Sequence, residues 1–145
     1  MILSRFKTFK ISKGCHYSGF RFRPFIYKRS MVADVVFTPS CRYDGSYQLE
    51  TQINKLFGFG SINHHNNSHR LGWRYSEDLD RVLIFEYFYI NGERFEKKIL
   101  KVCIGQNIRL KLKANKGYWF GKRLYPYFGG KEPAPHDLKI KINFL

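Results

Sequence analysis

The sequence predicts an all-β protein, an antiparallel two-sheet sandwich formed by one domain over residues 1–145. Short segments in which apolar and polar residues alternate follow one another along the chain, separated by Gly, Pro, Asn and Ser. No window of about a dozen residues has the i, i+3, i+4, i+7 spacing of an amphipathic helix. With 145 residues, of which 43% are hydrophobic, the chain can bury one core, so we expect one domain without a linker. The segments described below amount to about ten strands.

Strict alternation predicts three half-buried strands. In residues 107–113 the apolar positions Ile108, Leu110 and Leu112 are separated by cations. Residues 138–144 repeat this pattern, and residues 70–75 alternate in the same way. We expect Trp73, which lies between two apolar positions of the last segment, to be part of the core.

Residues 82–90 are apolar on both faces except at Glu86, and they lead directly into Asn91-Gly92. This dipeptide is the strongest short-range signal for a β-hairpin, because both positions tolerate a positive φ. Residues 93–104 are then the partner strand. Further strands are expected at residues 6–11, 20–27, 31–38, 47–53, 117–121 and 124–128.

The positive charge lies in two blocks that contain no acid. The chain has 26 Lys and Arg against 11 Asp and Glu, which gives a formal charge of +15. Residues 1–33 hold eight of the cations and residues 97–131 hold ten. If the two blocks meet in space, they create a field that attracts polymers of phosphate, sulfate or carboxylate groups. The other interpretation is that the lysines solvate exposed sheet faces and edges.

Three cysteines, Cys15, Cys41 and Cys103, cannot all pair within one chain, and they show no CxxC spacing. We expect the three cysteines to be small buried residues in strands, and we expect the protein to be in a reducing compartment. Residues 1–7 lack the apolar region of a secretory signal, so a cytoplasmic or virion-associated location is expected. No apolar run approaches the roughly 20 residues that span a bilayer, so no membrane span is expected.

Two parts of the chain resemble concanavalin A-like jelly rolls, a group that includes laminin-G-like domains. The hairpin of residues 83–98, with its Tyr89-Ile90-Asn91-Gly92 turn, resembles a hairpin common in that fold, and residues 124–137 are similar to its final loop. Residues 53–59 and 65–68 are similar to stretches of small bacterial and phage proteins. The resemblance implies a jelly-roll sandwich and speaks for fold more than for function.

Aromatic rings beside cations in residues 118–127 are typical of surfaces that stack on sugars or bases. Two asparagines of residues 63–69 could read sugar hydroxyls. The candidate ligand-binding residues are Trp119, Lys122, Arg123, Tyr125, Tyr127, Asn66 and Asn67. The candidate polyanion-binding residues come from the second basic block and are Lys97, Lys98, Lys101, Arg109, Lys111 and Lys113. No motif of a sequence-specific nucleic-acid module is found.

Candidate metal ligands are limited to His65 and His69, which have the four-residue spacing of a helical zinc pair. The intervening Asn-Asn-Ser favours a loop, and no nearby Cys or carboxylate completes the ligand shell, so neither a metal nor another cofactor is expected. The alternative is a polar loop that bonds its own backbone.

Candidate catalytic residues are His136, Asp137 and Tyr125, since a carboxylate beside an imidazole can orient it for acid–base work. No nucleophile elbow accompanies them. Asp78 and Asp80 have the spacing of two carboxylates on one strand, but the E-x-D-x-x-E signature of jelly-roll glucanases is absent. The sequence therefore does not assign a catalytic residue.

Three hypotheses follow from these patterns. The preferred one is a non-catalytic β-sandwich module that binds a glycan or another polyanion. The first alternative is a structural protein of a phage or other particle, which docks on acidic protein subunits or on nucleic acid without sequence specificity. The second alternative is a lyase or hydrolase acting on an anionic polysaccharide.

Overall fold

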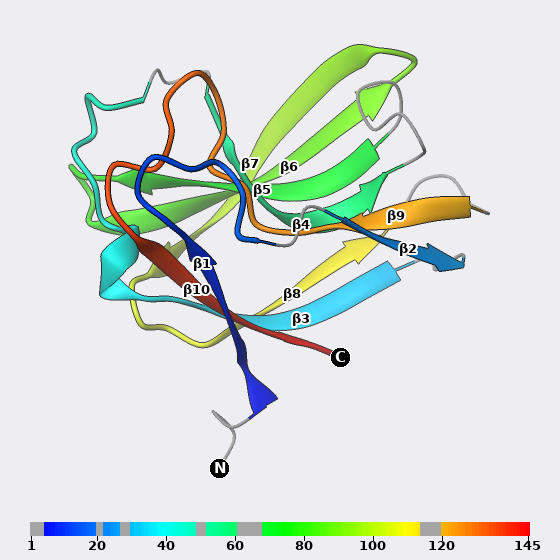
Figure 1. Ribbon diagram of the computed structural model, residues 1–145, viewed down its shortest axis with the longest axis horizontal. Coiled ribbons are helices and arrows are strands. Elements are labelled where there is room, and N and C mark those ends of the chain that lie inside the picture. The colour runs from blue at the N-terminus through cyan, green and yellow to red at the C-terminus, as the bar shows by residue number, and fades with distance from the viewer. Residues whose placement is uncertain (1–4, 20–21, 27–29, 49–51, 61–67, 114–119) are drawn as a thin grey trace.

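The computed structural model describes residues 5–19, 22–26, 30–48, 52–60, 68–113 and 120–145. Its strands form two sheets (Figure 1). The four-stranded sheet has the order β1-β10-β3-β8, with the strands β1 (Lys7–Ile11), β10 (Leu138–Phe144), β3 (Ser30–Phe37) and β8 (Ile108–Lys113). The six-stranded sheet has the order β2-β9-β4-β5-β6-β7, with the strands β2 (Phe22–Ile26), β9 (Phe120–Leu124), β4 (Asn54–Gly60), β5 (Ser68–Ser76), β6 (Arg81–Ile90) and β7 (Glu93–Cys103).

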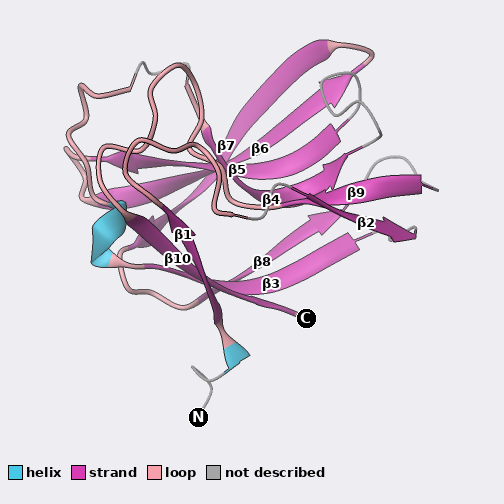
Figure 2. Ribbon diagram, in the orientation of Figure 1, coloured by secondary structure: helices cyan, strands magenta, loops and turns pink. Residues whose placement is uncertain are grey.

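All neighbouring strands are antiparallel, and the two sheets pack face to face as a sandwich. The predicted fold class is therefore confirmed. The longer connections gather at one end of the sandwich (Figure 2), where a single turn of 3-10 helix, η2 (Pro39–Cys41), follows β3. Within the described ranges, no helix is both long and apolar enough to pass through a bilayer.

Alternation along the strands decides which side chains enter the core. In β3, Met31, Ala33, Val35 and Phe37 are buried, while the residues between them point mostly outward. β8 and β10 behave in the same way, as their sequence patterns predict. The outward positions of these strands are therefore mostly polar or charged, and they form the solvent face of the four-stranded sheet.

The predicted hairpin is also confirmed. Asn91 has a φ of 50° and Gly92 a φ of 84°, which are the two positive values that a type I′ turn requires. β6 and β7 pair over their whole length, from Ile90 opposite Glu93 to Arg81 opposite Cys103. β7 has no partner on its other side within the described residues, so it is an edge strand.

The strand predicted at residues 47–53 is wrong for the residues described there, and β4 begins at Asn54 instead. β4 has no alternation to detect, because it is a central strand in which all seven residues are buried, including Lys55 and two glycines. Near the C-terminus, one strand, β9, spans the junction of the two segments predicted at 117–121 and 124–128.

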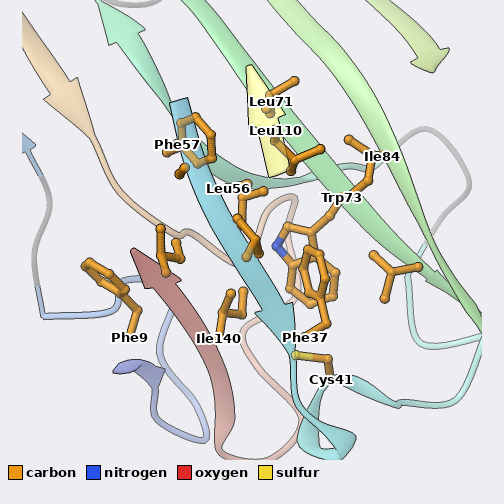
Figure 3. Close-up of a cluster of buried hydrophobic side chains, with 14 of the residues drawn as sticks. Phe9, Phe37, Cys41, Leu56, Phe57, Leu71, Trp73, Ile84, Leu110 and Ile140 are labelled. Atoms are coloured by element: carbon orange, nitrogen blue, oxygen red, sulfur yellow. The ribbon is translucent and has the colours of Figure 1, made fainter. Parts of the chain in front are cut away.

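One core cluster fills the space between the sheets (Figure 3). Trp73 is fully buried and packs with its ring centre 5.4 Å from that of Phe37, as expected. Cys41 is buried, but the expectation fails for Cys15 and Cys103, which are exposed. Cys15 lies in a turn, and Cys103 is next to the inward-pointing Val102 at the end of the edge strand, so its side chain points outward. All three cysteines are free.

Candidate functional site

Cations from both basic blocks and from the C-terminal strand gather on the outer face of the four-stranded sheet, which we call the basic face. Lys10 on β1 lies opposite Lys139 on β10, and Lys141 follows two residues later on the same face. The outward positions of β8 add three more cations. The basic face consists of Lys10, Arg109, Lys111, Lys113, Lys139 and Lys141.

Two carboxylates accompany these six cations. Asp34 accepts a forked pair of hydrogen bonds from Arg109, at 2.8 Å from Nε and 3.1 Å from Nη2, and these bonds hold the pKa of Asp34 below its usual value. Asp137 lies 3.4 Å from the ammonium of Lys10. The other four lysines form no ion pair within the described residues, so the basic face carries unneutralised positive charge.

The structure separates the predicted polyanion-binding residues into two groups. Arg109, Lys111 and Lys113 lie on the basic face. The other three, Lys97, Lys98 and Lys101, are exposed on β7, the edge strand of the six-stranded sheet. The sequence places them in one block because β7 and β8 are consecutive, but the chain changes sheets between these strands.

A second cationic site lies on the outer face of the six-stranded sheet and is largely buried. Three cations contact the ring of Tyr87 on β6: the ammonium of Lys55 is 4.0 Å from the ring centre, and the guanidinium carbons of Arg70 and Arg94 are at 5.3 and 5.2 Å. The register brings two of the cations here, because Arg70 is the cross-strand partner of Tyr87 and Arg94 is the partner of Tyr89, two residues along β6. We call these cations, with Tyr17, Tyr87, Tyr89 and Tyr127, the cation–tyrosine cluster.

The charges in this cluster do not balance. The one carboxylate that the described residues place in it, Glu96, lies 2.6 Å from Arg94. Lys55 donates to the carbonyl of Ile53, and its burial, together with the nearby guanidinium groups of Arg70 and Arg94, lowers its pKa to about 7. Burial also lowers the pKa of Arg70, whose Nε has no hydrogen-bond partner. Tyr87 stays protonated, because burial and its hydrogen bond with Tyr89 raise its pKa.

Two glycines make room for the cations. A methyl group at Gly58 would collide with the backbone of His69 and Arg70 and with Cγ of Arg70, so only glycine lets the Arg70 side chain cross β4. A methyl group at Gly129 would collide with the Ile53 carbonyl and approach the Lys55 ammonium to 3.3 Å. Both positions therefore need glycine, because the backbone passes close to the buried cations and leaves no room for a side chain.

A buried amide network fixes Lys55 and Tyr127 in place. Asn54 Oδ1 accepts from Gln48 Nε2 at 2.7 Å and from the Gly129 amide at 2.9 Å, and Gln48 Oε1 accepts from the hydroxyl of Tyr43 at 2.7 Å. The backbones of Lys55 and Tyr127 exchange two hydrogen bonds, at 2.8 and 3.0 Å. These bonds hold the segment after β9 against β4.

Of the predicted ligand-binding residues, Tyr127 belongs to the cation–tyrosine cluster, with its ring stacked on His16 at 5.4 Å. Tyr125 is in the core instead, stacked on Phe9 at 5.6 Å. The backbone of Lys122 and Arg123 forms part of β9. Trp119, Asn66 and Asn67 lie outside the described residues.

His136 and Asp137, the predicted catalytic pair, make separate contacts. Nε2 of His136 lies 2.6 Å from the carbonyl of Ser40, and Asp137 accepts from the backbone amide of Lys13 at 2.9 Å. Tyr125, the third candidate, is buried in the core. The two polar side chains therefore fasten loops, which is the ordinary role of such a pair in a turn.

His69 is buried on β5 against Phe88, with a pKa lowered by burial, and His65 lies outside the described residues. The part of the chain that the structure describes holds no group of three or more potential metal ligands. Asp80 is held by Arg42 at 2.9 Å and by the hydroxyl of Tyr75 at 2.7 Å, and Asp78 is exposed.

A hollow of about 600 Å³ lies farther along the same sheet face. Its lining combines the cations Arg74 and Lys98 with the acids Asp44, Glu77 and Asp78. Arg74 is already engaged there, since it donates to the carbonyls of Gln48 and Gln52. The mixed charge of this hollow distinguishes it from the cation–tyrosine cluster.

Sequence reasoning missed Lys55, Arg70, Tyr87 and Arg94. Arg70 follows the alternation of β5 and is expected on a solvated face. A signal was present, however: residues 82–90 are apolar on both faces, which predicts that part of the outer face of β6 is covered, and a cation opposite that part can be buried. In comparisons with protein-family models, curated proteins and solved structures, nothing matched this chain.

Proposed function

We propose that this protein is a non-catalytic β-sandwich module that binds an extended polyanion through the basic face. The observation that carries the proposal is the gathering of six cations, from three separate parts of the sequence, on one sheet face with two carboxylates. The jelly-roll resemblance agrees with a binding role, because lectin domains are among the proteins that have this architecture.

The spacing of the charges suits a repeating anionic ligand. Side chains two residues apart on a strand are separated by about 6–7 Å, and neighbouring strands by about 4.8 Å. Lys139 and Lys141 are related in the first way, and so are Lys111 and Lys113. Three of the four strands, β1, β10 and β8, thus present an array of cations on one sheet face, and this array attracts phosphate or sulfate groups by their charge.

The test compares two sets of lysines that remove the same charge. The first variant carries Lys111→Gln, Lys139→Gln and Lys141→Gln on the basic face, and the control carries Lys97→Gln, Lys98→Gln and Lys101→Gln on β7. Binding to a heparin-like sulfated oligosaccharide, single-stranded DNA and double-stranded DNA is measured by fluorescence anisotropy at about 50 and about 200 mM salt.

We expect steeply salt-dependent binding, and a loss of about tenfold or more in the basic-face variant with at most a twofold loss in the control. The dependence of log K on log salt should also become shallower by nearly one unit for each lysine removed when DNA is the ligand. The relative affinity for the oligosaccharide and the two forms of DNA identifies the polymer. Equal losses in the two variants, or no binding to any polyanion, would contradict the proposal.

A second candidate function, docking on another protein of a particle, is favoured by the β6–β7 hairpin. The hairpin extends away from the four-stranded sheet (Figure 1) and exposes four large apolar side chains, Ile90, Phe95, Ile99 and Leu100. Concentration-dependent association in light scattering that Phe95→Ser and Ile99→Ser abolish would support it. A monomer at all concentrations that also binds polyanions would favour the first function.

A further inference from the structure

The cation–tyrosine cluster contains two cations that have no anionic partner among the described residues, and both are more than nine-tenths buried. Lys55 retains 8% of its surface and Arg70 retains 7%. No ion pair joins either one to a carboxylate of the described residues, and Arg70 Nε lacks a hydrogen-bond partner. A buried charge is costly unless it is paired, so folded proteins rarely keep one without a reason.

The groups around these cations are hydrogen-bond donors. The hydroxyls of Tyr87 and Tyr89 lie 3.3 Å apart, and Tyr127 and Tyr17 pack edge to face with ring centres 4.9 Å apart. Phenols donate to an oxyanion as long as they are protonated, which burial ensures for Tyr87 and Tyr127. The only carboxylate of the described residues in the cluster, Glu96, is already paired with Arg94, whereas an anion would find a guanidinium, an ammonium and hydroxyls.

The cluster reaches the surface on one side. Tyr17 is 44% exposed, and the Arg94 side chain is 40% exposed. Tyr89 and Tyr127 are half-buried. Tyr17 contacts Tyr127, and both lie near Arg70, so the exposed rim and the buried cations belong to one cluster. This arrangement suits one small charged group and differs from the open array of the basic face.

We propose that Arg70 and Lys55, with the hydroxyls of Tyr87 and Tyr89, form a binding site for one compact oxyanion, a sulfate or phosphate group. Guanidinium and ammonium groups bind such oxyanions by charge-assisted hydrogen bonds. The ligand supplies the negative charge that the cluster lacks. The site lies on the opposite sheet from the basic face, so it does not depend on the function proposed above.

Binding should be coupled to a proton. Lys55 faces Arg70, Arg94, Glu96 and the ring of Tyr87, and it loses its proton near pH 7 in the free protein. A bound oxyanion favours the ammonium, so binding at pH 8 takes up close to one proton. Affinity consequently decreases as the pH is raised above 7.

The test is isothermal titration of the full-length chain with sodium sulfate and, separately, with sodium phosphate, against sodium chloride at matched ionic strength. The variants are Arg70→Gln and Lys55→Met, and Lys98→Gln is the control, an exposed lysine of the same sheet. Titrations at pH 8 in two buffers of different ionisation enthalpy measure proton uptake. Whichever of sulfate and phosphate binds more tightly identifies the group.

We expect the wild type to bind one oxyanion per chain with proton uptake, both site variants to bind at least tenfold more weakly, and Lys98→Gln to bind within twofold of the wild type. If Arg70→Gln does not fold, the affinity of Lys55→Met tests the proposal, because this variant removes a costly buried charge and is expected to fold. Equal effects of sulfate, phosphate and chloride, or an equal loss in Lys98→Gln and Lys55→Met, would overturn the proposal. The basic-face variant should keep this site and lose polymer binding, so the two proposals fail independently.

Discussion

The ammonium of Lys55 lies 4.0 Å from the centre of the Tyr87 ring, and both side chains are buried outside the main hydrophobic core. The negative face of the ring is a partial substitute for the carboxylate that Lys55 lacks. It does not offset the loss of hydration, because the pKa of Lys55 falls to about 7. Lys55 is therefore a buried side chain on the outer face of the six-stranded sheet that gains or loses its positive charge near neutral pH.

The first prediction concerns the pH dependence of stability. Lys55 has a pKa of about 7 in the folded protein and 10.5 as its ordinary value. Between these values the unfolded chain binds one proton more than the folded chain, so the free energy of unfolding rises with pH, by up to about 1.4 kcal/mol per unit. Below pH 7 Lys55 is charged in both states, and its full burial cost remains.

Replacing Lys55 by Met should therefore stabilise the protein at pH 6 and remove this slope. Urea unfolding of the wild type and of Lys55→Met from pH 6 to pH 10 measures the difference, with Lys98→Met as an exposed control. The two curves should converge as the pH rises. A constant separation between them across this range would show that Lys55 keeps its ordinary pKa.

The second prediction concerns the glycine beneath Arg70. Gly58→Ala should destabilise the fold by about 2–3 kcal/mol, because the new methyl group meets backbone atoms of β5 that cannot move without breaking the strand pairing. Gly45→Ala is the matched control, since its methyl group would meet the flexible end of Glu77 at 3.3 Å. Chemical denaturation of both variants checks this. Similar losses for the two would show that the collision is relieved locally.

The third prediction concerns the amide network next to Lys55. Asn54→Leu removes the acceptor of Gln48 Nε2 and of the Gly129 amide, and a donor to the Tyr43 hydroxyl. Because these partners are buried, we expect a loss of about 3 kcal/mol in the free energy of unfolding. Asn143→Leu, on the outer face of β10, should change it by less than about 0.5 kcal/mol. A small effect of Asn54→Leu would mean that water replaces its bonds.

The fourth prediction concerns the thiols. Burial raises the pKa of Cys41 to about 12, whereas Cys15 and Cys103 are exposed. A thiol reagent at pH 8 should therefore modify two cysteines rapidly in the native protein and the third only after unfolding in urea. In the Cys41→Ala variant, the number of rapidly modified cysteines should remain two. Rapid modification of three thiols without denaturant would be inconsistent with the burial of Cys41 at the end of η2.

The strands that the sequence predicted best are those with one solvent-exposed face. In β8 and β10 the period of two is visible because water selects polar residues at the outward positions, and this constraint acts on each strand separately. The turn at Asn91-Gly92 is equally local, since it depends on the φ values that two adjacent residues tolerate. β4 was missed because both of its faces are covered, and covering is a property of the whole fold.

The candidate sites show the same division. The sequence alone determined that the protein is basic, that most of its cations lie in two blocks, and that most outward positions of β8 and β10 carry lysine or arginine. Only the tertiary structure decided that β7 and β8 belong to different sheets, which separates Lys97 from Lys111, and that Lys55, Arg70 and Arg94 meet around one tyrosine ring. Alternation records whether a side chain leaves the core, but strand pairing across distant segments decides which other charges it then meets.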